Sequence, residues 1–410
     1  MASAFARHIE LISVAPDHVV VSFRTPRDEV VRVQVTPLGF GAPGATVSMG
    51  APAVADPMHD YHWARVDGLS PNTAYRIDVD GAPRSWRLAQ RPIRTLRRPP
   101  GAPVARIAMT NDVHFGEAEA GRIEQLRRVP IAQRIPGLRT LVHAHRMPDG
   151  LPNHARMMSA HAVADIQEWN PDLVVVKGDL TSNGRPEQYQ EFEEIYEPLL
   201  DRLVAFRGNH DSKLPEDTLP HRFFSVALDG VTVAVLDTVV RGRTHGAVDR
   251  VQIEWLREQA RMATQPLIVV GHHNLDVARS GRGPGRSFHY GVNTEDSRAL
   301  LEVFEAEPAI VGYFAGHTHR NFVGEGPRGI PIVETASAKE FPGTWAAYEL
   351  HSGGYLQTLY QVRAPEALAW SIETKKMFFG LAPVFSRGRV TDRGFTYDYD
   401  RVTRQNLGGA

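Results

Sequence analysis

The sequence predicts two folded domains, a small all-β sandwich followed by a larger α/β domain. The chain has 410 residues, and single hydrophobic cores stop growing near roughly 250–300 residues, so more than one core is expected. Roughly the first 95 residues alternate apolar and polar side chains, whereas from Ala105 onward short apolar runs alternate with helical periods. Between these two patterns lies Arg91–Val104, with four prolines and four arginines.

These patterns place the domain boundaries. We predict an N-terminal sandwich over residues 1–97, a catalytic domain over residues 98–362, and a C-terminal extension over residues 363–410. The proline- and arginine-rich stretch has the composition of a linker. The extension is rich in arginine and aromatic residues and shows no clear period, so we assign it no structure.

Composition excludes several classes of protein. The 42% apolar and 23% charged composition is typical of globular proteins, and no run approaches the ~20 apolar residues of a membrane span. The net charge of -1 disfavours nucleic acid as a partner. Because cysteine is absent, any metal must be held by nitrogen and oxygen. The N-terminus has no apolar signal region, which favours a cytoplasmic protein without membrane association.

In the N-terminal domain, three short runs are predicted as strands, namely Val19–Phe23, Val30–Val35 and Tyr75–Val79. Turn-forming residues gather between them, at Pro37–Gly44 and Gly68–Asn72. The second turn is part of a Leu-x-Pro-x-Thr-x-Tyr pattern formed by Leu69, Pro71, Thr73 and Tyr75. This corner resembles the one found in fibronectin type III domains and in the N-terminal domains of purple acid phosphatases.

In the second domain, short apolar runs predict the strands and longer amphipathic segments predict the helices. The predicted strands are Ala105–Thr110, Leu173–Lys177, Leu203–Phe206, Val231–Leu236, Leu267–Gly271 and Ile310–Ala315. The predicted helices are His154–Trp169, Pro186–Leu200, Val248–Met262 and Thr294–Glu305. Alternation over Ile330–Val333, Thr344–Leu350 and Leu356–Val362 predicts a β-meander at the end of the domain.

Polar residues that can bind metal follow five of these strands. The clusters are Asn111, Asp112 and His114; Asp179; Asn209, His210 and Asp211; His272 and His273; and His317 and His319. Since open α/β sheets bind ligands at the carboxyl ends of their strands, the five loops are expected to meet at one place. Glycine precedes four of the clusters, which lets the backbone turn sharply and approach an ion.

The order D-x-H, G-D, G-N-H-D, G-H, G-H-x-H resembles that of the calcineurin-like metallophosphoesterases, over about residues 104–362. The resemblance implies a β-sandwich core flanked by helices in four αββα layers. It also implies two metal ions, of which Mn, Fe or Zn suit imidazole and carboxylate ligands. One ion would be held by Asp112, His114 and His319, the other by Asn209, His272 and His317. Asp179 would bridge them.

The resemblance also suggests residues for catalysis and for substrate binding. His210 resembles the histidine that protonates the leaving oxygen, with Asp211 orienting its ring; a hydrogen-bonded loop histidine is the alternative. His273 either contacts substrate or caps its loop. We further expect Asn183 and Arg282 to contact the substrate. Arg282 lies in a glycine- and arginine-rich stretch, Arg279–Arg286, for which the alternative is a solvated loop without substrate contact.

The implied function is hydrolysis of a small phosphate ester, with a phosphodiester favoured, by attack of a metal-bound hydroxide. Purple acid phosphatases carry a metal-bound tyrosine three residues after the bridging aspartate, and this chain has Ser182 there. That departure weakens the alternative of a phosphomonoesterase of the acid-phosphatase type. A non-catalytic metal-binding scaffold is a further alternative, although none of the seven ligands is missing. The oligomeric state stays open.

Overall fold

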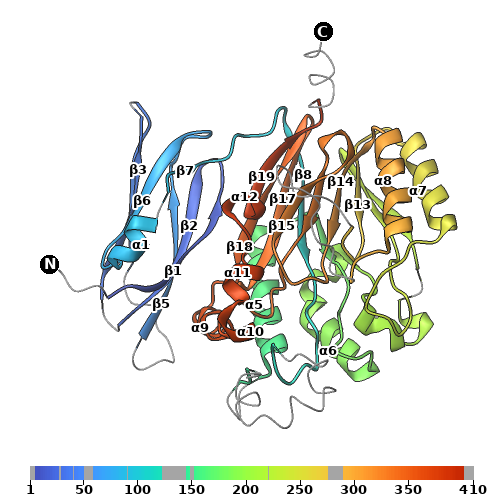
Figure 1. The fold of residues 1–410 in the computed structure, drawn as a ribbon, viewed down its shortest axis with the longest axis horizontal. Helices are drawn as coiled ribbons and strands as arrows, with labels where there is room; N and C mark the ends of the chain where they lie inside the picture. Colours follow the sequence, from blue (N-terminus) through green and yellow to red (C-terminus); the bar gives the residue numbers. More distant parts are fainter. Residues whose placement is uncertain are drawn as a thin grey trace.

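The N-terminal region is an all-β unit of two facing sheets, drawn in blue in Figure 1. The computed structural model describes residues 5–26, 29–39, 41–49, 59–89, 91–121, 145–147, 152–219, 221–275 and 290–400. One sheet has the order β1 (Arg7–Val14), β2 (His18–Pro26) and β5 (His59–Asp67). The other has the order β4 (Ala45–Met49), β3 (Val31–Pro37), β6 (Ala74–Val79) and β7 (Ile93–Arg94). Their shared core includes Val19, Val33 and Tyr75, and the short helix α1 (Arg84–Ala89) follows β6.

The rest of the described chain is built on two six-stranded sheets. The first has the order β10 (Leu203–Ala205), β9 (Leu173–Val176), β8 (Pro103–Thr110), β17 (Thr344–His351), β18 (Gly354–Gln361) and β19 (Gly394–Asp398). The second has the order β11 (Phe224–Leu228), β12 (Val231–Val235), β13 (Leu267–Val270), β14 (Ile310–Ala315), β16 (Pro331–Glu334) and β15 (Phe322–Glu325). Parallel pairing joins β8, β9 and β10 in one sheet and β12, β13, β14 and β16 in the other.

Helices cover the outer face of each sheet, which gives four layers (Figure 1). Helices α7 (Arg250–Met262) and α8 (Thr294–Ala306) pack on the second sheet, and the core beneath them continues between the two sheets. Helices α5 (His154–Trp169) and α6 (Pro186–Tyr196) pack on the first sheet through a separate core. This arrangement confirms the predicted αββα architecture. Shorter 3₁₀ turns occur at η1 (Glu197–Arg202), η2 (Asn209–Lys213), η3 (Glu216–Thr218) and η4 (Pro327–Gly329).

One predicted element is wrong. The three alternating runs after residue 330 were expected to form one meander, but β16 lies in the second sheet while β17 and β18 lie in the first. The reason is that β17 pairs antiparallel with β8, whose other neighbour is β9, so the chain crosses from one sheet to the other between residues 334 and 344. Only β17 and β18 form the expected hairpin.

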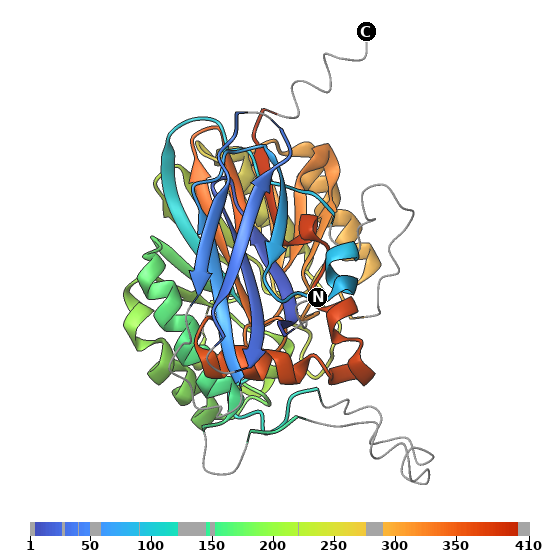
Figure 2. The same cartoon turned by 90° about the vertical axis from the view of Figure 1, so that its left-hand side faces the viewer.

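The C-terminal segment, which was left unassigned, is described as far as residue 400. Its helices lie between the two β units in Figure 1, and in Figure 2 they are seen in red below and beside the blue strands. It forms α9 (Pro365–Thr374), α10 (Met377–Gly380), α11 (Ala382–Phe385) and α12 (Val390–Arg393) before β19 completes the first sheet. The N-terminal unit docks on this segment, since Glu10 on β1 pairs with Lys375 at 2.9 Å and with Arg387 at 2.7 Å. The side chain of Arg393 also donates to the carbonyl of Leu11.

The boundary between the first two predicted domains lies between β7, which ends at Arg94, and β8, which begins at Pro103. Its placement at residues 97 and 98 stays a prediction. Among the helices that the structure describes, none combines the length and the apolar character needed to cross a bilayer.

Candidate metal centre

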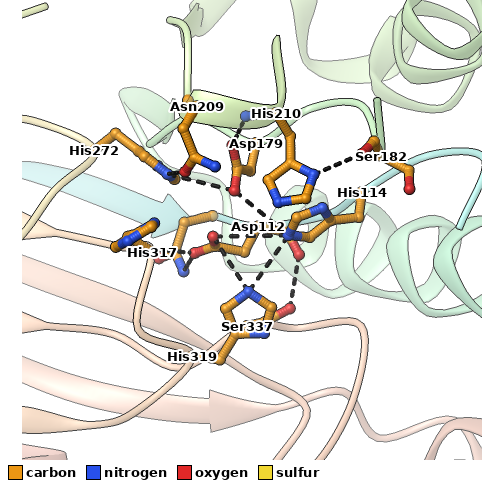
Figure 3. A network of polar contacts seen from close by, with 12 residues as sticks. Asp112, His114, Asp179, Ser182, Asn209, His210, His272, His317, His319 and Ser337 are labelled. Carbon is orange, nitrogen blue, oxygen red and sulfur yellow. Dashed lines mark hydrogen bonds and ion pairs between the residues drawn. The ribbon is translucent and has the colours of Figure 1, made fainter. Parts of the chain in front are cut away.

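The five polar clusters meet at one edge of the two sheets. They follow β8, β9 and β10 of the first sheet and β13 and β14 of the second. Figure 3 shows side chains from all five clusters pointing toward a common centre, namely Asp112, His114, Asp179, Asn209, His210, His272, His317 and His319. Several groups of three of these side chains have ligand atoms within 4.8 Å of one another: His272, His273 and His317; Asp112, His114 and His319; His114, Asp179 and His210; and Asp112, Asp179 and His272.

The backbone of these loops is left-handed at five positions that are not glycine. The φ angles are 54° at Asp112, 48° at His114, 52° at Asp179, 66° at His317 and 50° at His319. Non-glycine residues seldom adopt this region, and such conformations cluster at functional sites, where the surrounding structure holds them. The strain is concentrated in the residues whose side chains converge, so the loops are built to aim those side chains.

Glycine serves close packing here as well as turning. Gly208 precedes Asn209, and a Cβ atom at Gly208 would lie 2.2 Å from Oδ1 of Asp179. The loops after β9 and β10 can therefore meet only if this position has no side chain. Glycine was expected to let the backbone approach an ion. At Gly208 it lets the backbone approach the neighbouring loop at Asp179.

One half of the centre is formed by Asp112, His114 and His319. Oδ2 of Asp112 accepts from the backbone N–H of His317 at 2.8 Å. Oδ1 of Asp112 is buried, has no hydrogen-bond partner among the described residues, and lies 3.3 Å from Nε2 of His319. The Nε2 atoms of His114 and His319 are 3.4 Å apart. Ring nitrogens and a carboxylate oxygen that face one another in a buried space are a donor set that fits a cation.

The other half contains Asn209, His272 and His317. Nδ1 of His272 donates to the carbonyl of Lys177 at 2.8 Å, so Nε2 is the ring nitrogen left to face a metal. That Nε2 atom lies 3.1 Å from Oδ1 of Asn209. The ring of His317 lies with its centre 5.1 Å from that of His272. The donors are again nitrogen and oxygen, as the lack of cysteine requires.

Asp179 lies between the two halves. Its Oδ2 atom is 3.6 Å from Nε2 of His114 in one half and 3.4 Å from Nε2 of His272 in the other. Its Oδ1 atom accepts from the backbone N–H of His210 at 2.8 Å, which fixes the orientation of the carboxylate. This is the position that a carboxylate shared by two cations would occupy.

Burial keeps two of the histidines neutral. It lowers the pKa of His114 to about 3, with a further contribution from the nearby His210. It also lowers the pKa of His317 to about 4, with a contribution from His272. Neutral imidazole is the form that binds metal.

Carboxylates have the opposite effect on the other two histidines. Burial disfavours the charged form of His272, but Asp179 and Asp112, with the hydrogen bond to the Lys177 carbonyl, together outweigh burial and raise the pKa of His272 to about 9. For His319, burial is likewise outweighed, here by Asp112 and Glu340 together, which raise the pKa to about 10. Without a metal, these carboxylates hold protons on the two rings. A metal ion would replace those protons, since ligands bind in their deprotonated forms.

His210 lies at the exposed side of the centre, with its ring edge-on to that of His114 and the two ring centres 4.6 Å apart. Asp211 was expected to orient this ring, and the structure corrects that expectation. Both oxygens of Asp211 accept from loop groups, namely the backbone N–H of Leu180, Thr181 and Gly208 and the Thr181 hydroxyl. The ring of His210 instead donates from Nδ1 to the carbonyl of Ser182 at 2.5 Å.

The three predicted substrate contacts differ in their positions. Asn183 is exposed and follows Ser182, whose carbonyl accepts from the ring of His210. His273 is fully buried, and its Nδ1 atom is hydrogen-bonded to the hydroxyl of Thr238 at 2.7 Å. A buried ring has no surface to offer a substrate, so the expected substrate contact by His273 is not supported. Arg282 lies outside the described residues.

Sequence reasoning missed the residues behind the centre. Nδ1 of His319 donates to Oε1 of Glu340 at 2.6 Å, and Glu340 pairs with Lys339 at 2.9 Å. Both residues lie in a loop without apolar periodicity, twenty residues and more after the last histidine motif. The one available signal was two adjacent charges within an otherwise apolar and small-residue segment, which alone indicates no contact with a histidine.

Comparison with known proteins places these features in a family. The sequence pattern of the calcineurin-like phosphoesterases matches residues 105–321, more than half of the chain. A "Probable cyclic nucleotide phosphodiesterase" of Rhodococcus erythropolis is 37% identical over 25% of this chain and 38% of its own length. A cAMP/cGMP dual specificity phosphodiesterase of Mycobacterium tuberculosis is 34% identical over 36% of this chain and 49% of its own. A glycerophosphodiester phosphodiesterase of Enterobacter lignolyticus is 29% identical over 36% and 56%. The chain thus spans between 38% and 56% of these relatives' lengths.

Proposed function

The chain belongs to the calcineurin-like phosphoesterase family, and from this premise we propose that it hydrolyses a small phosphodiester with the help of two metal ions. The observation that carries the proposal is the convergence of nitrogen and oxygen donors from five strand-end loops, with Asp179 between two groups of ligands. Such a site combines the ligands of a binuclear centre with an exposed histidine at its edge. Phosphoester hydrolysis can use the first to bind two metal ions and the second as a general acid.

We assign the ligands as the sequence suggested. Asp112, His114 and His319 would hold one ion, Asn209, His272 and His317 the other, and Asp179 both. The donor set suits Mn, Fe or Zn. When bound, the two ions would stabilise the charge on the attacking and the leaving oxygen of an in-line displacement.

His210 is proposed as the proton donor to the leaving oxygen. Because Nδ1 donates to the carbonyl of Ser182, the ring orientation is fixed and Nε2 is the atom that can carry a proton to the substrate. His210 is exposed, whereas the neighbouring Asn209 is nearly buried, so His210 is the one of the pair that a substrate can reach. Exposed Asn183 would contact the substrate beside it. Contact by Arg282 remains a prediction.

A diester is favoured over a monoester for two reasons. The relatives named above carry phosphodiesterase names, for cyclic nucleotides and for glycerophosphodiesters. Ser182 also stands where the acid phosphatases carry their metal-bound tyrosine. We therefore propose a small diester of one of these two kinds as the substrate, in a protein that we continue to expect in the cytoplasm.

The N-terminal unit is proposed to be a fibronectin type III-like domain over residues 1–97. Its support is the corner at Tyr75, where the buried ring places its hydroxyl to accept from the backbone N–H of Ser70 at 2.8 Å. A tyrosine that bonds back to the backbone a few residues upstream is characteristic of such sandwiches. The catalytic domain would then occupy residues 98–362.

The substrate class can be tested directly. Protein reloaded with Mn²⁺ is assayed on bis(p-nitrophenyl) phosphate and on p-nitrophenyl phosphate, and then on 3',5'-cyclic AMP and glycerophosphocholine. We expect kcat/KM to be at least about ten-fold higher for the chromogenic diester than for the monoester, which corresponds to ~1.4 kcal/mol of transition-state binding. A higher kcat/KM for the monoester would contradict the proposal.

A further inference from the structure

A chain of buried ion pairs lies behind His319. Nδ1 of His319 donates to Oε1 of Glu340 at 2.6 Å, and Oε2 of Glu340 pairs with Nζ of Lys339 at 2.9 Å. The same Nζ atom lies 2.5 Å from Oε2 of Glu117, which also contacts Nε2 of His154 at 3.1 Å. Lys339 and Glu340 are 1% and 3% exposed, so water does not screen these charges.

This geometry leaves Glu340 one orientation. A buried carboxylate needs a partner for each oxygen, and here one oxygen faces the imidazole while the other faces the ammonium group. The hydrogen bond from Nδ1 fixes the tautomer of His319 and directs Nε2 toward Asp112 and His114, at 3.3 and 3.4 Å. The two carboxylates and one ammonium group leave an excess negative charge behind the ring, which favours a cation on its other side.

The backbone that carries this pair is held by helix α9. The indole N–H of Trp370 donates to the carbonyl of Lys339 at 2.9 Å. The hydroxyl of Thr374 accepts from the backbone N–H of Phe341 at 2.9 Å. Helix α9 belongs to the C-terminal segment, beyond residues 105–321 that match the family. The support of His319 therefore comes from outside the matched part of the chain.

We infer that Glu340, held by Lys339, is a positioning residue that sets the metal affinity of the half-site formed by Asp112, His114 and His319. The inference rests on the proposed binuclear function and extends it to a residue of the loop between β16 and β17, whose backbone helix α9 holds. The rival explanation is that Glu340 is an ordinary buried ion pair whose loss lowers stability alone.

Glu10 provides a matched control for the explanation that Glu340 affects stability alone. It is also a buried carboxylate, 9% exposed, and it pairs with Lys375 and Arg387. It lies on β1 of the N-terminal unit and is no part of the metal centre. Glu340→Gln and Glu10→Gln thus remove the same charge from two similar environments, one behind a ligand and one away from it.

The experiment measures Mn²⁺ binding to metal-stripped protein by electron paramagnetic resonance, together with thermal unfolding of the metal-free proteins. We expect Glu340→Gln to weaken one of two Mn²⁺ sites by about 10–100-fold, the usual cost of losing such a partner. Glu10→Gln should lower the Tm and leave both affinities within two-fold of wild type. Unchanged Mn²⁺ affinities in Glu340→Gln would overturn the inference. A wild type that binds no Mn²⁺ would overturn the proposed function as well.

A double-mutant cycle shows whether Glu340 acts through His319. In the His319→Ala background, adding Glu340→Gln should change Mn²⁺ affinity by less than two-fold, because the ring that Glu340 positions is gone. If the fold-losses in Mn²⁺ affinity caused by the two single substitutions instead multiply in the double variant, Glu340 acts independently of His319 and the positioning role is wrong.

Discussion

At the scale of single residues, Asp179 is the side chain that we propose both metal ions share. One carboxylate faces His114 and His272 at 3.6 and 3.4 Å. Its removal would leave two cations without the negative charge that offsets their mutual repulsion. We expect Asp179→Ala to lose most of the bound metal and, with it, the activity. Elemental analysis after dialysis measures this, with the exposed Asp172→Ala as control. Retention of two metals with near-normal turnover would show that Asp179 does not bridge.

His210 should behave differently. A general acid contributes typically 10²–10⁴-fold to the rate, and His210 is held by the Ser182 carbonyl and is assigned no metal. His210→Ala should therefore lower kcat in that range while metal content stays at the wild-type level. His221→Ala, at another exposed histidine, serves as control. Because a ring nitrogen of His210 also lies within 4.8 Å of ligand atoms of His114 and Asp179, loss of metal in His210→Ala would mean that His210 is a ligand.

Ser182 leads to a spectroscopic prediction. Protein loaded with ferric iron should lack the intense visible band of an iron-bound tyrosinate, since serine occupies the position of that tyrosine. Tyr313 is an unsuitable substitute because its hydroxyl donates to the carbonyl of His273 at 2.7 Å and burial raises its pKa, which keeps it a phenol. An intense violet-to-purple band would contradict this, and its loss in Tyr313→Phe or Tyr290→Phe would identify the ligand.

At the scale of elements, the predictions succeeded where sequence signals are local. Helix α5 has the predicted bounds because Asn153 caps its start by accepting from the backbone N–H of Arg156, and Asn170 ends it in the left-handed conformation with φ 53°. The buried strands β9 and β13 are continuous apolar runs of four residues, which is typical of strands covered on both faces.

The elements that were missed lack such signals. Strand β19 is a five-residue edge strand of which only Gly394 and Tyr397 are buried, and it is held in the sheet by antiparallel pairing with β18. The contact between His319 and Glu340 joins loops 21 residues apart in sequence, and no periodicity links them. The metal-capable residues could be predicted because each follows a strand. Their support could not, because it comes from tertiary contacts alone.

Helix α9 gives a prediction at this scale. The hydroxyl of Thr374 accepts from the backbone N–H of Phe341 in a fully buried environment. Thr374→Val keeps the shape and leaves that N–H without a partner, which costs about 1–3 kcal/mol. Chemical denaturation should show this decrease in the free energy of unfolding. Thr396→Val is the control, because its hydroxyl bonds near solvent to the carbonyl of Arg97 and its loss should cost under about 0.5 kcal/mol. Equal effects would contradict the assigned role of Thr374.

At the scale of the whole molecule, Glu10 connects the N-terminal unit to the C-terminal segment. Burial raises the pKa of Glu10, but Lys375 and Arg387 outweigh burial and hold the pKa below its ordinary value of 4.5. A carboxyl with a lowered folded-state pKa stabilises the protein above its unfolded pKa, and this stability is lost as pH falls through the folded pKa. The protein should therefore lose stability below about pH 4.5.

The test compares the free energy of unfolding of wild type and Glu10→Gln between pH 3 and 6. We expect the two proteins to differ most at pH 6 and to converge as the pH falls, because glutamine does not titrate. The effect of other acidic groups is common to both proteins and cancels in the difference. A difference that is constant over this range would show that the Glu10 carboxylate does not titrate with folding.

The central claim is that two metal ions in the convergent site carry out the hydrolysis. It is tested most directly by titrating metal-stripped protein with Mn²⁺ while following hydrolysis of bis(p-nitrophenyl) phosphate. We predict no turnover without metal, a rise that is complete only after the second equivalent per chain, and no recovery in Asp179→Ala at the same Mn²⁺ concentration. Turnover in the stripped protein, or full activity with one equivalent, would contradict a binuclear centre.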